Sequence, residues 1–214
     1  MTEPGVPDVA ALPPSGASSW NVANALTLAR LLLVPVFAAL LMYEDGNDTG
    51  YRVAAWAVFA VASFTDRLDG ELARRRGLIT PFGQIADPIA DKALTGAALI
   101  GLSALGELPW WVTIAVLVRE VGVTALRFWV IRHGVIPASR GGKLKTLLQG
   151  LAIGLYVLPL SGLLATARTA VMVAALVVTF VTGADYVARA LRLRRTSERA
   201  AMKRARRAAR EAGS

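Results

Sequence analysis

Six apolar stretches follow one another along the chain, separated by short polar segments. They cover residues 21–43, 51–73, 88–105, 109–131, 146–166 and 169–190. Most of them approach the roughly 20 residues that a helix needs to cross about 30 Å of hydrocarbon. The pattern therefore predicts an all-α integral membrane protein, built as a bundle of six transmembrane helices.

The two ends of the chain differ from this apolar part. Residues 1–20 contain proline, glycine, serine and two acids but no lysine or arginine, so they lack the basic start of a signal peptide and are expected to form a disordered tail. Residues 191–214 are rich in arginine and in helix-forming residues. They form either a solvated anchor or a continuation of the sixth helix along an anionic membrane surface. The membrane domain is expected at residues 21–190.

Basic residues are distributed unevenly between the polar segments. They are scarce after the first, third and fifth stretches, where only Arg168 is found. The segments 74–92 and 132–145 carry four each, and the chain from residue 189 carries ten. Because basic loops stay on the cytoplasmic side, both termini and the segments after the second and fourth stretches are expected in the cytoplasm of a cell-membrane protein.

The composition agrees with a membrane protein and narrows its chemistry. Hydrophobic residues make up 55% of the 214 residues and charged residues 18%, against roughly 25% charged in a soluble domain. The absence of cysteine excludes disulfides and thiolate sites, and the single histidine, His133, argues against histidine-rich metal sites and serine-hydrolase chemistry. In a chain this apolar, the net charge of +9 indicates an anionic membrane face and no nucleic-acid partner. Any catalysis must depend on carboxylates, basic side chains or hydroxyl groups.

Four aspartates lie where the second stretch ends and the third begins. Asp66 and Asp69 are three residues apart and Asp87 and Asp91 are four apart, so each pair occupies one face of a helix. If the two helices are antiparallel neighbours, the carboxylates converge, and their mutual repulsion calls for divalent cations. Oxygen ligands without histidine or cysteine favour Mg²⁺ or Mn²⁺ over Zn²⁺. Cations held in this way suit a phosphate-bearing substrate.

Small residues accompany the aspartates. Gly70 and Ala73 follow the first pair on the same helix face, Gly83 precedes the second pair, and Arg74 stands beside them as a candidate phosphate ligand. The small residues leave room for a bulky ligand to approach the backbone. A lone pair of acids at a helix end is usually a solvated face, but the whole arrangement on the basic side of a membrane points to a site.

The segment DRLDGELARRRGLITPFGQIADPIAD resembles the signature of the CDP-alcohol phosphotransferases, integral membrane enzymes of phospholipid synthesis, at every fixed position. The resemblance implies a six-helix homodimer that transfers a phosphatidyl group from a CDP-linked lipid to an alcohol and releases CMP, with two bound divalent cations. By the matching positions, the metal ligands are Asp66, Asp69, Asp87 and Asp91; the general base is Asp91; and the nucleotide site is shaped by Asp69, Gly70, Ala73, Arg74 and Gly83. Asn24 and Thr27 either contact the nucleotide or cap the first helix.

Two further stretches, NVANALTLARLLLVPVF and REVGVTALRFWVIRHGVIPASRGGKLKTLLQ, resemble the bacterial members that make phosphatidylglycerophosphate. The donor is then CDP-diacylglycerol, from the surrounding membrane lipid, and the acceptor is sn-glycerol 3-phosphate. A phosphate monoester needs several basic donors, which an uncharged alcohol does not. The candidates are Arg30, Arg119, Lys143 and Lys145, although Arg119 can equally pair with a neighbouring helix and the two lysines can be interfacial anchors.

Three alternatives remain open on the sequence. The first is another enzyme of this kind, which makes phosphatidylinositol phosphate or cardiolipin with the same donor machinery. The second is a divalent-cation transporter, although its acids would be expected at the membrane midplane and not at helix ends. The third is a membrane scaffold, which leaves four clustered carboxylates uncompensated. Asp185 and Tyr186 are unusual in a membrane span and receive no role.

Overall fold

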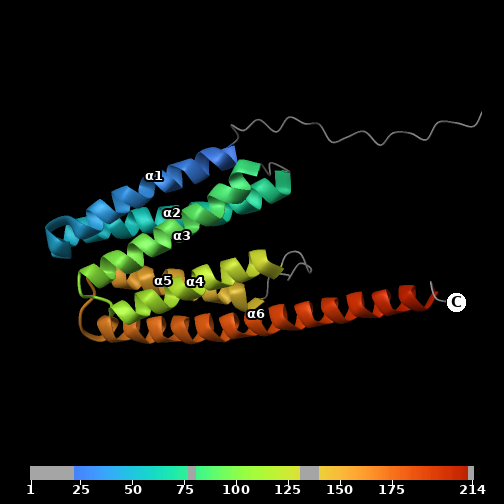
Figure 1. Cartoon of the computed structure of the whole chain (residues 1–214). Coiled ribbons are helices and arrows are strands. Elements are labelled where there is room, and N and C mark those ends of the chain that lie inside the picture. The colour runs from blue at the N-terminus through green and yellow to red at the C-terminus, as the bar shows by residue number, and fades with distance from the viewer. Residues whose placement is uncertain (1–21, 77–80, 131–139, 212–214) are drawn as a thin grey trace, which may run out of the picture.

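A computed structural model describes the backbone of residues 22–76, 81–130 and 140–211, and the side chains of 25–65, 89–90, 92–130 and 141–194. Within these residues every regular element is a helix, as the apolar pattern predicts. The elements are α1 (Val22–Met42), the 3-10 turn η1 (Tyr43–Gly46), α2 (Thr49–Arg76), α3 (Pro81–Ala104), α4 (Trp110–Val130), α5 (Arg140–Val157) and α6 (Gly162–Glu211) (Figure 1).

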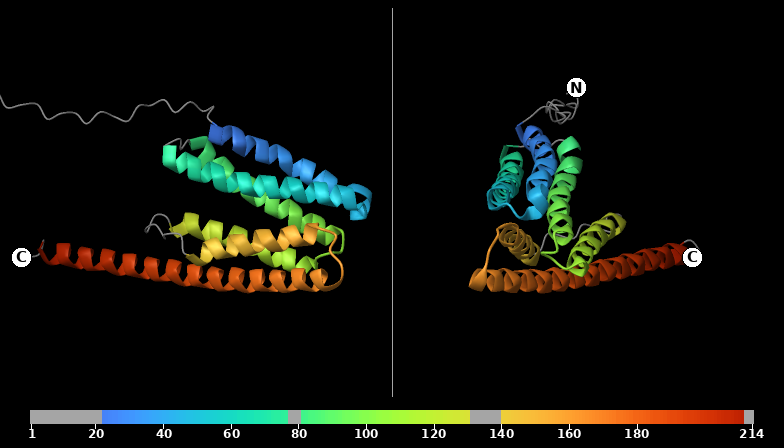
Figure 2. Two further views of the ribbon diagram at one scale, coloured as in Figure 1. Left: turned by 180° about the vertical axis from the view of Figure 1, so that it is seen from behind. Right: turned by 90° about the vertical axis from the view of Figure 1, so that its left-hand side faces the viewer.

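The helices form two packed groups. In the first, α1 lies against both α2 and α3, and in the second, α6 lies against both α4 and α5. Contacts of α2 and α3 with α5, and of α3 with α4, join the two groups. Successive helices run in opposite directions, so that α2 ends and α3 begins at the same end of the bundle (Figures 1 and 2). The long α6 continues beyond the other helices at this end.

The helix boundaries confirm most of the predicted stretches and correct one. The fifth stretch was expected to run as one helix to residue 166, but α5 ends at Val157 and α6 begins at Gly162. Pro159 lies in the turn between them and has no N–H with which to continue a helix. Gly162 adopts a φ of +59°, which reverses the chain at little steric cost. Hydrophobicity alone does not reveal this turn, because the residues on both sides of it are apolar.

The first turn of the bundle is also tight. Glu44, Asp45 and Gly46 all have positive φ values, of 48°, 53° and 72°. Any other residue at Gly46 would be strained at this φ, and its Cβ atom, 2.7 Å from Cδ1 of Leu105, would displace that side chain. This glycine therefore lets the α1–α2 turn pack against the end of α3.

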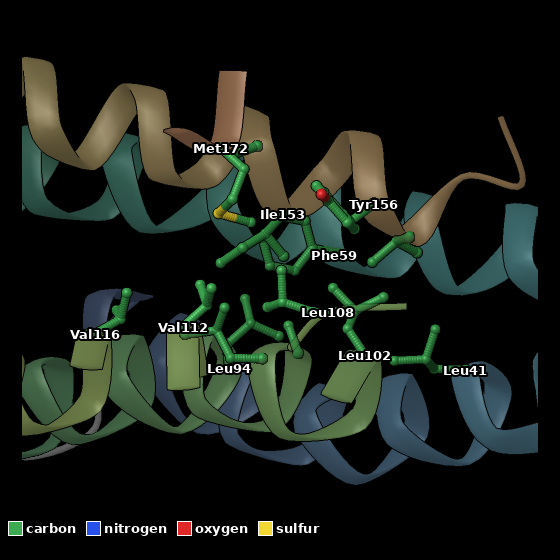
Figure 3. Close-up of a cluster of buried hydrophobic side chains, with 14 of the residues drawn as sticks. Leu41, Phe59, Leu94, Leu102, Leu108, Val112, Val116, Ile153, Tyr156 and Met172 are labelled. Carbon is green, nitrogen blue, oxygen red and sulfur yellow. The ribbon is translucent and has the colours of Figure 1, made fainter. Parts of the chain in front are cut away.

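The core lies between the two groups of helices. It combines large side chains such as Phe37, Phe59 and Ile153 with alanines, and the rings of Phe37 and Phe59 are 5.8 Å apart at their centroids. Figure 3 shows Leu94, Leu102 and Val112 facing Ile153, Tyr156 and Met172 across this interior. Small residues at the contacts allow helices to approach closely where a hydrophobic driving force between them is weak, as in a membrane.

Large apolar side chains also cover the outside of the bundle. Leu163 is 84% exposed, Phe128 69% and Leu32 64%, and so extensive an apolar surface indicates contact with lipid. Within the described part of the chain, two helical segments, Ala25–Gly46 and Gly162–Arg194, are long and apolar enough to span a membrane, and Lys92–Ala104 is a shorter apolar segment. The protein is thus associated with a membrane, whereas six spans remain a prediction.

A charged network joins the turns at the end of the bundle opposite the α2–α3 connection. Arg52 is 4% exposed and donates from Nε to the carbonyl of Val157 at 2.9 Å and from Nη2 to that of Tyr156 at 2.7 Å. Its Nη1 lies 3.0 Å from Oε1 of Glu107, whose Oε2 accepts from Arg168 at 2.8 Å. Arg52 thus satisfies the last carbonyls of α5, which have no partner within the helix.

Candidate functional site

The four aspartates of the predicted metal site lie at one end of the bundle. Asp66 and Asp69 belong to the last three turns of α2, and Asp87 and Asp91 to the first three turns of α3. Figure 1 shows these two helix ends side by side, as the short connection between them requires. Their side chains lie outside the described residues, so the convergence of the carboxylates remains a prediction.

The predicted nucleotide site shares this position. The side chains of Asn24, Ala73 and Arg74, and the surroundings of Gly70 and Gly83, also lie outside the described residues. Among the described side chains, no group of three or more histidine, cysteine, aspartate or glutamate residues is placed to hold a metal ion. The predicted metal ligands on α2 and α3 are not among these described side chains.

A cavity of about 110 Å³ lies between α1, α2, α3, α4 and α5. It begins beside the predicted metal site: Lys92 follows Asp91 directly, and Ser63 precedes Asp66 by less than one turn. The lining residues are Arg30, Phe59, Ala62, Ser63, Lys92, Leu94, Thr95, Leu117, Glu120, Val121, Lys145, Thr146, Gln149 and Gly150. Residues that line the cavity are therefore close neighbours in sequence of the predicted metal ligands. The walls of the cavity are partly apolar and partly charged.

Two of the four predicted acceptor-phosphate residues line this cavity. Arg30 comes from α1 and is 1% exposed, and Lys145 comes from α5 and is 8% exposed. Thr27, one turn before Arg30, is also buried, at 1% exposure. A basic side chain in a membrane helix is costly and usually marks a functional site. The structure thus brings together two basic groups that are far apart in the sequence.

The other two predicted residues lie elsewhere. Arg119 turns toward α6, where its Nε donates to the carbonyl of Thr179 at 3.2 Å and its Nη2 to the hydroxyl of Thr182 at 3.1 Å. Gly183 packs directly against it, since a Cβ there would lie 3.2 Å from Nε of Arg119. Lys143 is exposed and does not line the cavity. The contacts of Arg119 are those of a helix-packing residue.

Glu120 contacts one predicted residue that lines the cavity, Lys145, and one that does not, Arg119. Its Oε1 accepts a hydrogen bond from Nζ of Lys145 and lies 3.1 Å from Nη1 of Arg119. It lines the cavity from α4. Because a carboxylate holds the ammonium group of Lys145 in one orientation, Glu120 positions the positive charge that faces the cavity.

Sequence reasoning did not select Lys92 or Gln149 for the site. Lys92 directly follows Asp91 in the sequence. Gln149 follows Lys145 by about one turn of α5, so helix periodicity places it on the same face as Lys145 and could have indicated it. No sequence signal shows that α4 contributes Glu120 to the same cavity, because that depends on how α4 packs against α3 and α6.

The sequence is similar to one family of known proteins. Residues 20–181 match the CDP-alcohol phosphatidyltransferase family. The chain is 63% identical over 172 residues to a probable phosphatidylglycerophosphate synthase of Mycobacterium tuberculosis, covering 80% of this chain and 82% of the relative. It is 37% identical over 149 residues to the CDP-diacylglycerol–glycerol-3-phosphate 3-phosphatidyltransferase of Bacillus subtilis, covering 65% of this chain and 77% of that enzyme. An enzyme with the same description from Rickettsia typhi is 37% identical over 143 residues, which is 66% of this chain and 79% of the relative.

Proposed function

The chain belongs to the CDP-alcohol phosphatidyltransferase family, and we propose that it transfers the phosphatidyl group of CDP-diacylglycerol to sn-glycerol 3-phosphate. The products are phosphatidylglycerophosphate, a phospholipid precursor, and CMP. The similarity to synthases described by this reaction supports both substrates. The membrane association of the bundle suits a donor that is itself a lipid.

One structural observation carries the choice of acceptor. Arg30 and Lys145, both more than nine-tenths buried, line the cavity beside Asp91, and Lys92 adds a third basic group. An acceptor that is a phosphate monoester, with a charge near −2, is attracted by such a cluster, whereas an uncharged alcohol is not. We therefore propose that the phosphate of the acceptor binds between Arg30 and Lys145. Arg119 and Lys143 contribute more weakly, at longer range.

Enzymes of the family generally use divalent metal ions. The carboxylates of Asp66, Asp69, Asp87 and Asp91 would hold two such ions, Mg²⁺ or Mn²⁺, since hard oxygen ligands at adjoining helix ends suit these metals. Bound there, the ions supply neutralisation of the charge on the pyrophosphate oxygens and on the departing CMP.

The reaction itself is a single displacement. Asp91 acts as the general base and takes the proton of the acceptor hydroxyl while the hydroxyl oxygen bonds to the lipid-side phosphorus of CDP-diacylglycerol. The bond from that phosphorus to the CMP oxygen breaks, and CMP leaves with the electron pair. Arg74, together with the small residues Gly70, Ala73 and Gly83, holds the nucleotide, with Asn24 and Thr27 beside it.

We propose that the active site and both termini face the cytoplasm. The starts of α1, α3 and α5 and the ends of α2, α4 and α6 lie at one end of the bundle (Figure 1), which is the end of the basic segments. The positive-inside rule favours the cytoplasm for that end. The six membrane spans and the homodimer implied by the family resemblance are part of the proposal, and cysteine cross-linking in membranes tests the dimer.

Release of CMP by the purified protein tests the reaction. The protein is supplied with CDP-diacylglycerol and Mg²⁺, and with either glycerol 3-phosphate or inositol phosphate. We expect CMP and phosphatidylglycerophosphate with the first acceptor and loss of both when EDTA removes the metal. Release with inositol phosphate alone would contradict the choice of acceptor, and Mg²⁺ flux into liposomes without nucleotide would indicate a transporter.

A further inference from the structure

The side chain of Gln149 is buried in the wall of the cavity without a complete set of hydrogen bonds. It is 7% exposed, and its Oε1 has no hydrogen-bond partner in the described part of the chain. Buried amide oxygens in proteins almost always have a partner, because leaving one unpaired is costly. An exception that lines a cavity beside a proposed active site indicates a group that arrives with the ligand.

The chemistry of the amide limits what that group is. An amide offers both an acceptor and a donor, and the oxygen and nitrogen positions can exchange by rotation of the group. A phosphate dianion only accepts hydrogen bonds, and it is already matched by Arg30, Lys92 and Lys145 around the cavity. A hydroxyl group both donates and accepts, so it satisfies the amide in either orientation.

The position of Gln149 on α5 agrees with a hydroxyl close to the phosphate. Gln149 follows Lys145 by four residues, so both lie on one face of the helix about 6 Å apart along its axis. In glycerol 3-phosphate, the hydroxyl on C2 lies between the phosphate and the hydroxyl that attacks the donor. A phosphate bound at Lys145 therefore leaves the C2 hydroxyl within reach of Gln149 on the next turn of α5.

We propose that Gln149 recognises the C2 hydroxyl of the acceptor and makes the enzyme selective for a phosphorylated polyol over a simple phosphorylated alcohol. This inference rests on the proposed function. It adds a specificity-determining residue, since the C2 hydroxyl takes no part in the displacement. A site with a polar group built for a substrate hydroxyl rejects the analogue without it, because the polar group is then left unpaired.

The test compares glycerol 3-phosphate with 3-hydroxypropyl phosphate, which keeps the attacking hydroxyl and the phosphate but lacks the C2 hydroxyl. We expect kcat/KM of the wild-type protein to favour glycerol 3-phosphate by about tenfold or more. In Gln149→Met, which has a similar volume and no amide, kcat/KM for glycerol 3-phosphate should fall until the two acceptors differ by less than about twofold.

A second variant keeps the test decisive if the methionine protein does not fold. Gln149→Glu has nearly the same shape and still accepts a hydrogen bond from the C2 hydroxyl, but its charge repels the phosphate. We expect KM to rise for both acceptors while the preference for glycerol 3-phosphate remains.

Three outcomes would overturn the inference. Equal turnover of both acceptors by the wild-type protein removes the selectivity while leaving the proposed function intact. An equal fall for both acceptors in Gln149→Met shows a structural role. Failure of the wild-type protein to use glycerol 3-phosphate at all contradicts the proposed function and, with it, the role of Gln149.

Discussion

Two of the polar clusters among the described residues of this bundle differ in how completely their groups are paired. At one end, Arg52, Glu107 and Arg168 join three turns of the chain, and both Arg52 and the α5 carbonyls that it contacts have partners within the protein. In the cavity, Glu120 holds Lys145, but Oε1 of Gln149 has no partner among the described residues.

The difference separates a structural cluster from a binding site. A charge in a membrane protein needs a partner or a use. Arg52 has its partners in the folded chain, whereas the cavity cluster combines several basic groups with an unpaired amide beside the predicted metal ligands. We therefore expect changes in the first cluster to reduce stability, and changes in the second to reduce the rate or the affinity for the acceptor.

The largest expected effect is on stability, in Arg52→Met. The substitution leaves the last carbonyls of α5 unpaired and removes one partner of Glu107, so the free energy of unfolding in detergent micelles should fall by about 3 kcal/mol. The matched control is Arg189→Met, which removes an exposed pair with Asp185 and should cost about 0.5 kcal/mol or less. Equal losses in the two variants would mean that the buried network stabilises the fold no more than the exposed pair does.

Asp91→Asn should have the largest effect on turnover. The amide cannot take a proton from the acceptor hydroxyl, so kcat should fall by about 100-fold or more. Binding of CDP-diacylglycerol, measured by equilibrium titration, should remain close to that of the wild-type protein. Near-normal turnover would remove Asp91 from the role of general base.

Substitutions of the two lysines at the start of α5 should have smaller effects, and they compare a buried position with an exposed one. Lys145→Met removes a buried charge from the cavity and leaves Glu120 to repel the acceptor phosphate, so KM for glycerol 3-phosphate should rise by about tenfold. Lys143→Met, at an exposed position two residues earlier, should change KM by about twofold or less. A larger effect at Lys143 would move the phosphate site out of the cavity.

The smallest expected effect is that of Arg168→Gln. Arg168 bonds Glu107 and lies 4.7 Å from the ring centroid of Tyr156, but Glu107 keeps Arg52 as a partner. The loss in unfolding free energy should be about 1 kcal/mol, with both Michaelis constants unchanged. A change in the KM for either substrate would contradict the separation of the two clusters.

The helical fold class was predictable from the sequence, and the predicted metal site at the four aspartates also needs no packing information, because each depends on residues close together in the chain. The length of the apolar stretches predicts helices. The four aspartates from Asp66 to Asp91 lie within 26 residues, and their spacing predicts a metal site. The charged lining of the cavity was predicted only in part. Arg30 and Lys145 were selected because charges stand out in apolar stretches, but the same signal selected Arg119, whose described contacts are with Glu120 and with α6.

Local pattern alone was therefore enough to establish a helical membrane protein with an acidic cluster at adjoining helix ends and most of its positive charge at one side. Packing decided the rest: that α5 ends before Pro159, that Arg52 closes one end of the bundle, and that Glu120 and Gln149 meet Arg30 and Lys145 around one cavity. Helix periodicity determines which face a residue occupies, but the neighbour that this face meets depends on how whole helices fit together. No stretch of sequence contains that information locally.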